Sequence, residues 1–239
     1  MAELKTTAEK TTKGFDFSAT LKDTFDTLKA VFKKPATTDT KKYDNAKTAG
    51  IFAGFAAIIY LLIDLISAVI STIVVKECAN VSFASFSCTE YKTKVNFENL
   101  NNFKFFETLG NNILTLLGAV AVVAGVVYVM GLIFKKQPKF MKLVAVVTAG
   151  LAPLFVAAFV SGILAYIWTP LAIFVTFAGI VLSIAYMINA ISKEIVLDGD
   201  KKIFFHVVSI IAIFIVAYFI LTSIAKDSAA AAYIKLLGL

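Results

Sequence analysis

The sequence predicts an all-α, polytopic membrane protein with five transmembrane helices, and three observations carry this prediction. Of its 239 residues, 59% are hydrophobic and only 16% are charged, whereas soluble domains have about 45–50% apolar and about 25% charged residues. Five apolar stretches are long enough to cross about 30 Å of hydrocarbon, which takes about 20 helical residues. All 23 basic residues are lysine, and they alternate between the connecting segments. A soluble domain and a disordered chain are both excluded.

The five apolar stretches cover residues 48–75, 113–134, 143–167, 171–191 and 203–225. Trp168, Thr169 and Pro170 alone connect the third stretch to the fourth, so these two helices are expected to form an antiparallel hairpin. Proline is tolerated in a first helical turn, and tryptophan favours the membrane interface.

The chain is therefore expected to have four parts. They are a disordered cytoplasmic tail over 1–17, an amphipathic cytoplasmic helix over 18–34, a transmembrane domain over 48–225 with an external loop at 76–108, and a short external tail at 226–239.

The lysines predict the orientation of the chain in the membrane. Seventeen of them lie in the segment before the first span and in the connections after the second and fourth, and six lie on the opposite side. The positive-inside rule then places the N-terminus in the cytoplasm and the C-terminus outside, which fits an odd number of spans. The Lys-, Ile-, Asn- and Phe-rich composition is typical of an AT-rich genome, so we expect a multi-pass protein of a bacterial plasma membrane.

The segment before the first span predicts a helix that lies on a membrane surface or on the bundle itself. Leu21, Phe25, Leu28 and Phe32 recur with the spacing of one helical face, while charged residues occupy the other face. Pro35 ends the pattern.

The external loop contains both cysteines of the chain, Cys78 and Cys88, and many aromatic residues. Two cysteines in one extracytoplasmic loop favour a disulfide, and two free thiols are the alternative. A metal site is not expected, because no histidine accompanies the pair.

Asp64 is the one acidic residue inside a predicted span, near the middle of the first. An intramembrane carboxylate is costly and is a candidate functional group. Tyr60 and Ser67 share its helical face, and Gly50 and Gly54 extend that face as a G-x-x-x-G step for helix packing. The alternatives are a hydrogen-bonded structural carboxyl, a proton or cation site, and a substrate contact.

Pro153 interrupts the third span and is expected to kink it, because proline lacks an N–H group and frees a carbonyl near Ala149. Kinked packing and a transporter-like binding site are the two interpretations. Nucleotide-binding, zinc-protease and serine-hydrolase motifs are absent from the sequence, and we expect no enzyme, no cofactor and no metal.

The order of these features resembles the Yip (Ypt/Rab-interacting) family of integral membrane proteins, in its bacterial form. The resemblance covers about residues 20–225. It rests on Phe32-Lys33-Lys34-Pro35 ahead of the first span, the long external loop, the basic turn from Lys135 to Lys142, and Ala152-Pro153-Leu154 in the third span. The Asp-Leu-Tyr-Gly-Pro motif of eukaryotic members is absent. The resemblance implies a five-helix bundle that acts in membrane organisation, lipid handling or partner docking, without catalytic residues.

The function expected from the sequence is that of a non-enzymatic membrane scaffold or adaptor. Its basic N-terminal segment and its aromatic external loop are expected to engage lipids or partner proteins. The alternatives are a small transporter, channel or scramblase-like protein that uses Asp64 and the kinked third helix, and an immunity or receptor-type protein. The partners expected are the bilayer, a protein and a second copy of the chain. Nucleic acid is not expected, because the net charge of +7 is a topology signal.

Overall fold

The computed structural model describes residues 17–34, 41–82 and 87–225, without the side chains of 76–91 and 220–225. The elements in chain order are α1 (Phe17–Lys33), η1 (Lys41–Tyr43), α2 (Ala46–Ile73), β1 (Val74–Ser82), β2 (Ser87–Val95), η2 (Phe97–Asn102), α3 (Phe105–Ile133), α4 (Phe140–Gly150), α5 (Ala152–Leu164), α6 (Thr169–Glu194) and α7 (Gly199–Ala225).

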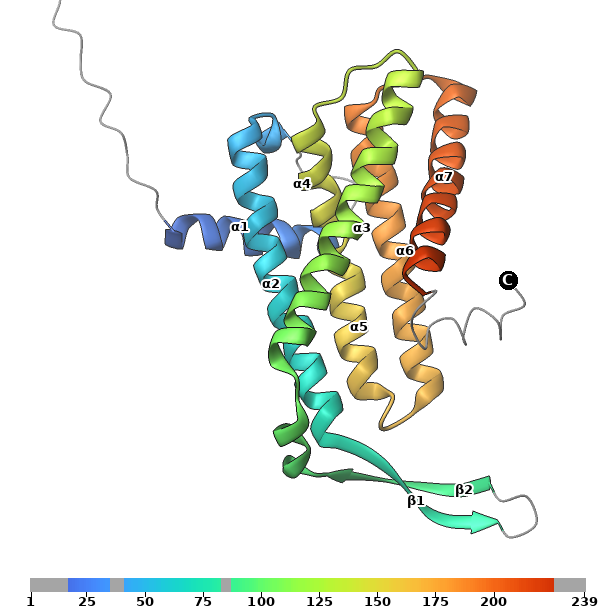
Figure 1. Cartoon of the computed structure of the whole chain (residues 1–239). Helices are drawn as coiled ribbons and strands as arrows, with labels where there is room; N and C mark the ends of the chain where they lie inside the picture. The colour runs from blue at the N-terminus through green and yellow to red at the C-terminus, as the bar shows by residue number, and fades with distance from the viewer. Residues whose placement is uncertain (1–16, 35–40, 83–86, 226–239) are drawn as a thin grey trace, which may run out of the picture.

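Five spans run up and down beside one another, as the sequence predicts: α2, α3, α4 with α5, α6, and α7 (Figure 1). The start of α2, the α3–α4 turn and the α6–α7 turn lie at one end of the bundle. We call this the lysine-rich end, because it gathers the lysines of 41–47, 135–142 and 193–202. The β1–β2 pair and the α5–α6 turn lie at the other end, which we call the hairpin end.

The third span is the centre of the bundle. In its apolar stretch 61% of the residues are buried, against 28% or less in the other four spans. Its α4 half contacts α2, α3 and α6, and seven consecutive side chains from Leu143 to Ala149 carry no charge and are small or branched. A helix that is apolar on every side is expected to be buried on every side.

Small residues set how closely the third span approaches its neighbours. At Gly179 of α6, an added Cβ would lie 2.2 Å from the Cβ of Ala157 and 2.9 Å from the carbonyl oxygen of Pro153. The backbones of α5 and α6 are therefore in near contact, which is the usual way in which helices pack in lipid.

The loop expected at the hairpin end contains regular structure. β1 and β2 pair antiparallel from Val74 opposite Val95 to Ser82 opposite Ser87, with a bulge near Asn80. Thr93 of β2 donates a hydrogen bond to the carbonyl of Tyr166 at 3.4 Å, which links this pair to the α5–α6 turn.

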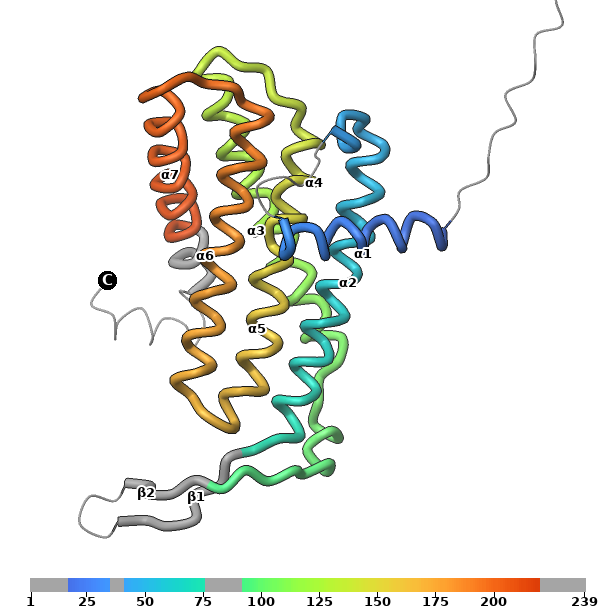
Figure 2. The backbone as a smooth tube through the Cα atoms, turned by 180° about the vertical axis from the view of Figure 1, so that it is seen from behind, coloured from blue at the N-terminus to red at the C-terminus, as the bar shows by residue number. Residues whose placement is uncertain are grey.

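The helix α1 does not continue the bundle but crosses it. Figures 1 and 2 both show it running across the spans, at the level where α4 gives way to α5. It contacts α2, α4 and α5. Of the two positions that the sequence leaves open, the structure has α1 packed against the bundle.

The end of α3 has an unusual residue in its terminating turn. Lys135 has a φ of 57°, a left-handed conformation that glycine normally supplies at this position. The N–H of Lys135 donates to Leu132 and that of Lys136 donates to Gly131, at 2.9 Å each, and these bonds close the last turn of α3.

Gly179→Ala is expected to lower the free energy of unfolding by about 1–3 kcal/mol, because its Cβ overlaps Ala157 and a backbone oxygen of Pro153. Thermal unfolding in detergent measures the effect. Gly54→Ala is the matched control, since nothing lies within 4 Å of a Cβ there. Equal melting temperatures for the two variants would contradict the packing described here.

Candidate functional site

The break in the third span is closed by side chains from two neighbouring helices. Pro153 has no N–H, and the next one, that of Leu154, donates to Ser183 Oγ of α6 at 3.1 Å. Tyr60 of α2 donates its hydroxyl to the carbonyl of Thr148 at 2.6 Å. Backbone groups freed inside a membrane need such partners, because no water is present to satisfy them.

Close packing surrounds the same break. The ring of Tyr60 stacks on Phe155 with centroids 4.5 Å apart and planes 3° from parallel. A Cβ at Gly150 would lie 2.5 Å from Met187 Cγ. The break is therefore filled by protein groups, which favours kinked packing over a binding site at Pro153.

Asp64 lies apart from this cluster. It is nine residues before the end of α2 at Ile73, so it lies just past the middle of the helix on the side of the hairpin end. Its side chain is half-buried and makes no hydrogen bond or ion pair with another described residue. Tyr60 is engaged at the break, and Ser67 donates to the carbonyl of Ile63 at 3.0 Å. The structure does not join these three residues into one polar site.

The two glycines of the G-x-x-x-G step have different surroundings. A Cβ at Gly50 would lie 3.3 Å from the methyl carbon of Met141 in α4, whereas Gly54 has nothing within 4 Å. Gly50 thus packs within the chain and Gly54 faces outward. A homodimer through this face stays a prediction.

The strand register does not favour the predicted disulfide. Cys78 pairs with Tyr91 and Cys88 pairs with Val81. Three residues of strand separate the two rungs, about 10 Å at about 3.3 Å per residue, whereas the Cα atoms of a disulfide lie within about 7 Å. The cysteine side chains lie outside the described part.

The face of α1 that packs on the bundle differs from the predicted stripe. Thr24, Thr27, Leu28 and Val31 are buried. Of the predicted stripe, Leu28 packs inward and Leu21 is half-buried, but Phe25 and Phe32 are exposed. The inward hydroxyls are satisfied within the helix, since Thr24 donates to the carbonyl of Thr20 and Thr27 to that of Asp23. The phenylalanines point outward.

Lys42 fastens α1 to the start of the membrane domain. Its Nζ lies 2.9 Å from Asp23 Oδ1 and also donates to Thr27 Oγ1. Both acceptors lie on α1 and the donor lies on η1, just before α2. Chain connectivity and this ion pair together hold α1 across the bundle.

A second charged cluster ties three segments together at the lysine-rich end. Lys142 of α4 places its Nζ 2.5 Å from Asp44 Oδ1 and 2.5 Å from Glu194 Oε2, and its side chain is only 9% exposed. Lys139 adds a hydrogen bond to the carbonyl of Asp44 at 3.3 Å. The sequence identifies Lys142 only as a topology signal. Asp44 and Glu194 lie far from Lys142 in the chain, so no local sequence pattern predicts that they pair with it.

The environment of Asp44 favours its charged form. The hydrogen bond from Lys142 holds the pKa of Asp44 below its ordinary value of 3.8. Desolvation by burial is the next largest effect and opposes it, while the charges of Lys142, Lys139 and Lys41 lower the pKa further. Asp44 therefore stays ionised to a lower pH than an ordinary aspartate does.

The model of the Yip1 domain matches residues 29–221, which covers the last turn of α1 and all five spans. The chain belongs to the Yip1 domain family. No curated protein and no solved structure matches it. The family resemblance seen in the sequence is thus confirmed, and the Yip1 domain here is a multi-pass membrane protein with five apolar helices.

Lys142→Met is expected to destabilise the Yip1 domain by about 3–5 kcal/mol, because it leaves Glu194 buried without a partner. Unfolding in detergent measures this. The control is Lys139→Met, whose side chain is exposed and contacts Asp44 only through a carbonyl. The double variant Lys142→Met/Glu194→Gln should recover part of the loss. Additive losses in the double variant would show that the two charges do not interact.

The cluster also predicts loss of stability in acid. A carboxylate whose folded pKa is lowered stabilises the fold above its unfolded pKa of about 3.9, and this contribution disappears as the pH falls through the folded value. The stability difference between wild type and Asp44→Asn should be complete at pH 6 and should shrink below about pH 4. Melting temperatures from pH 6 to pH 2.5 test this, and a difference independent of pH would contradict it.

Proposed function

We propose that this Yip1 domain protein is a non-enzymatic membrane scaffold that gathers acidic lipids of one leaflet through its lysine-rich end and α1. By the positive-inside rule we assign that end to the cytoplasm. The observation that carries the proposal is the arrangement of charge. Lys135, Lys136, Lys201 and Lys202 are exposed and make no ion pair with another described residue.

Lysines placed next to a membrane attract acidic lipids by about 1 kcal/mol each. The four free lysines come from the α3–α4 connection and from the first turn of α7, so the fold brings together charges that lie far apart in the chain. By contrast, Lys42 and Lys142 are paired with carboxylates. The cluster residues hold the surface in place and the exposed lysines are available to lipid.

The outward face of α1 supports the same proposal. Phe17, Phe25 and Phe32 are exposed, while the threonines and Val31 pack inward. Helices in lipid pack through small residues and direct large apolar side chains to the acyl chains. We therefore assign α1 as a lipid-facing part of the scaffold. A protein partner on this face is the alternative outcome.

A transport function ranks second. It is supported by Asp64, which is half-buried and has no partner among the described residues. Its other support was the break at Pro153, and that break is filled by Tyr60, Ser183 and close helix packing. No path through the bundle is indicated by these contacts.

Retention of lipid during purification tests the proposal. Wild-type protein extracted from vesicles of phosphatidylcholine and phosphatidylglycerol should retain phosphatidylglycerol preferentially, as measured by native mass spectrometry. Lys201→Gln/Lys202→Gln removes two exposed charges and should weaken this preference by about 30-fold, from about 1 kcal/mol per lysine. Raised salt should weaken it as well.

The matched control is Lys92→Gln/Lys94→Gln, which removes two exposed lysines from the hairpin end. It should leave the preference unchanged. Equal losses in the two double variants, or a preference that salt does not alter, would overturn the proposal. A protein that co-purifies with wild type and is lost with Phe25→Ala/Phe32→Ala would favour the protein-adaptor alternative.

A further inference from the structure

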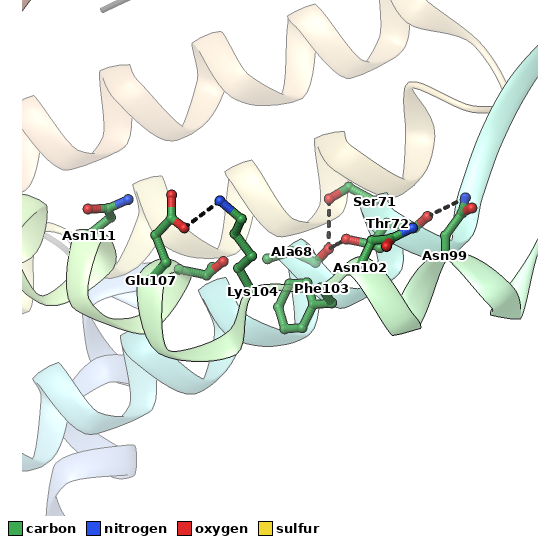
Figure 3. A pocket seen from close by; sticks show the side chains of 10 residues that line it. Ala68, Ser71, Thr72, Asn99, Asn102, Phe103, Lys104, Glu107 and Asn111 are labelled. Atoms are coloured by element: carbon green, nitrogen blue, oxygen red, sulfur yellow. Dashed lines mark hydrogen bonds and ion pairs between the residues drawn. The ribbon is translucent and has the colours of Figure 1, made fainter.

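A polar cavity of about 460 Å³ that is widely open to the surface lies at the hairpin end, between the last turns of α2, the helix η2 and the first turns of α3 (Figure 3). Its size falls within the range of small-molecule sites, about 300–1,000 Å³. It is separate from the lysine-rich end and from the break at Pro153. Asp64 does not line it but lies one helical turn deeper than Ala68, which does.

The charges in this cavity cancel. Lys104 and Glu107 both line it, and they pair with each other at 2.9 Å (Figure 3). The hydrogen bond from Lys104 to Glu107 raises the pKa of Lys104, so the ammonium group is held in its charged form. A simple anion or cation would have to displace one member of this pair, and the lining therefore favours a neutral ligand.

The remaining polar groups offer hydrogen bonds that the protein does not use. Asn102, Thr108 and Asn111 line the cavity, and their side chains make no hydrogen bond with another described residue. By contrast, Asn99 donates to the carbonyl of Thr72 at 3.1 Å, and Ser71 donates to that of Ala68 at 2.9 Å. Two amides and one hydroxyl thus remain free.

Amide and hydroxyl groups each donate and accept hydrogen bonds. Their complement is a ligand that does both at several adjacent atoms, and a run of neighbouring hydroxyl groups has this property. Phe103 adds an apolar ring to the lining, against which the C–H face of a sugar or glycerol backbone can pack. The lining has the chemistry of a polyol site.

The level of the cavity in the membrane favours a lipid as the source of the bound polyol group. α2 has 28 residues, or about 42 Å at about 1.5 Å per residue, which equals a bilayer with its headgroups. Its last turn, which carries Ser71 and Thr72, therefore reaches the headgroup layer. A headgroup from the surrounding leaflet can enter from the side, and a dissolved polyol can enter from the water.

We propose that this cavity binds a neutral polyhydroxylated group, such as the sugar headgroup of a glycolipid, through Asn102, Thr108 and Asn111. The site is independent of the proposed function, because it lies at the opposite end of the bundle and recognises no charge.

The test uses full-length protein in phosphatidylcholine nanodiscs, prepared without sugar-based detergents, which would occupy the site. The probe is monoglucosyl diacylglycerol, and diacylglycerol with the same acyl chains is the control lipid. Native mass spectrometry should show that the glucolipid is retained over diacylglycerol. Asn102→Ala/Asn111→Ala should weaken this retention about tenfold, the effect of two lost hydrogen bonds.

Asn189→Ala is the matched control. Asn189 is an exposed asparagine on α6 that donates to the carbonyl of Ala185 and lies outside the cavity. It should retain the glucolipid as wild type does. Equal retention of the two lipids, or equal loss in both variants, would overturn the proposal. Unchanged melting temperatures for the double variant separate lost binding from lost folding.

Competition with methyl glucoside distinguishes a lipid headgroup from a dissolved sugar as the source of the bound group. Displacement of the glucolipid by millimolar methyl glucoside supports recognition of the sugar itself, from lipid or from solution. Absence of displacement, together with the loss in the double variant, supports a site that requires the lipid. Phosphatidylglycerol retention at the lysine-rich end should be the same in all of these variants, so failure of either proposal is seen separately.

Discussion

The interruption of the third span is the constraint on which the rest of the bundle depends. A proline in the most buried helix removes one N–H, and the adjoining turn cannot use water in its place. Tyr60 and Ser183 supply the missing partners from α2 and α6. This fixes the height of both helices relative to the break, since a shift of one residue would carry either hydroxyl out of reach.

The region around the break also sets the spacing between the axes of neighbouring helices. Gly150 and Gly179 allow Met187 and Ala157 to approach the backbone, and α1 crosses the outside of the bundle at the same level. At the lysine-rich end Lys142 applies a second constraint, because its two carboxylate partners come from the segment before α2 and from the end of α6. Hydrogen bonds thus position the helices at mid-height and ion pairs position them at one end.

Much of this fold is predictable from the sequence, and the parts that are not share a physical cause. Hydropathy locates five spans, the missing N–H of Pro153 locates the break, and the period from Leu21 to Phe32 locates α1 to within a residue. The sequence does not identify the face of α1 that packs on the bundle. Thr24 and Thr27 pack inward while Phe25 and Phe32 face out, because hydrophobicity alone does not separate the inside of a membrane protein from its outside.

The candidate sites likewise divide into residues that the sequence singles out and residues that only the fold brings together. Asp64 is conspicuous as the one acid of the first span, yet it has no partner among the described residues. Lys142 and Asp44 meet across 98 residues of chain, a distance at which no local pattern operates. The glycines show the limit most clearly, because the recognisable Gly50–Gly54 step packs only at Gly50, while isolated Gly150 and Gly179 make the tight contacts. Composition reveals which residues are small, and only the fold decides which of them are crowded.

The placement of α7 has a consequence for how the protein is made. The helices packed most extensively on α4 are α2, α3 and α6, all of which precede α7 in the chain, whereas α7 packs mainly on α3. A nascent chain that has released residues up to Glu194 already holds the partners of the broken helix, including the donor hydroxyl of Tyr60 and the acceptor hydroxyl of Ser183. The core can therefore assemble during synthesis, before the last span leaves the ribosome, and α7 then docks on a surface that is already complete.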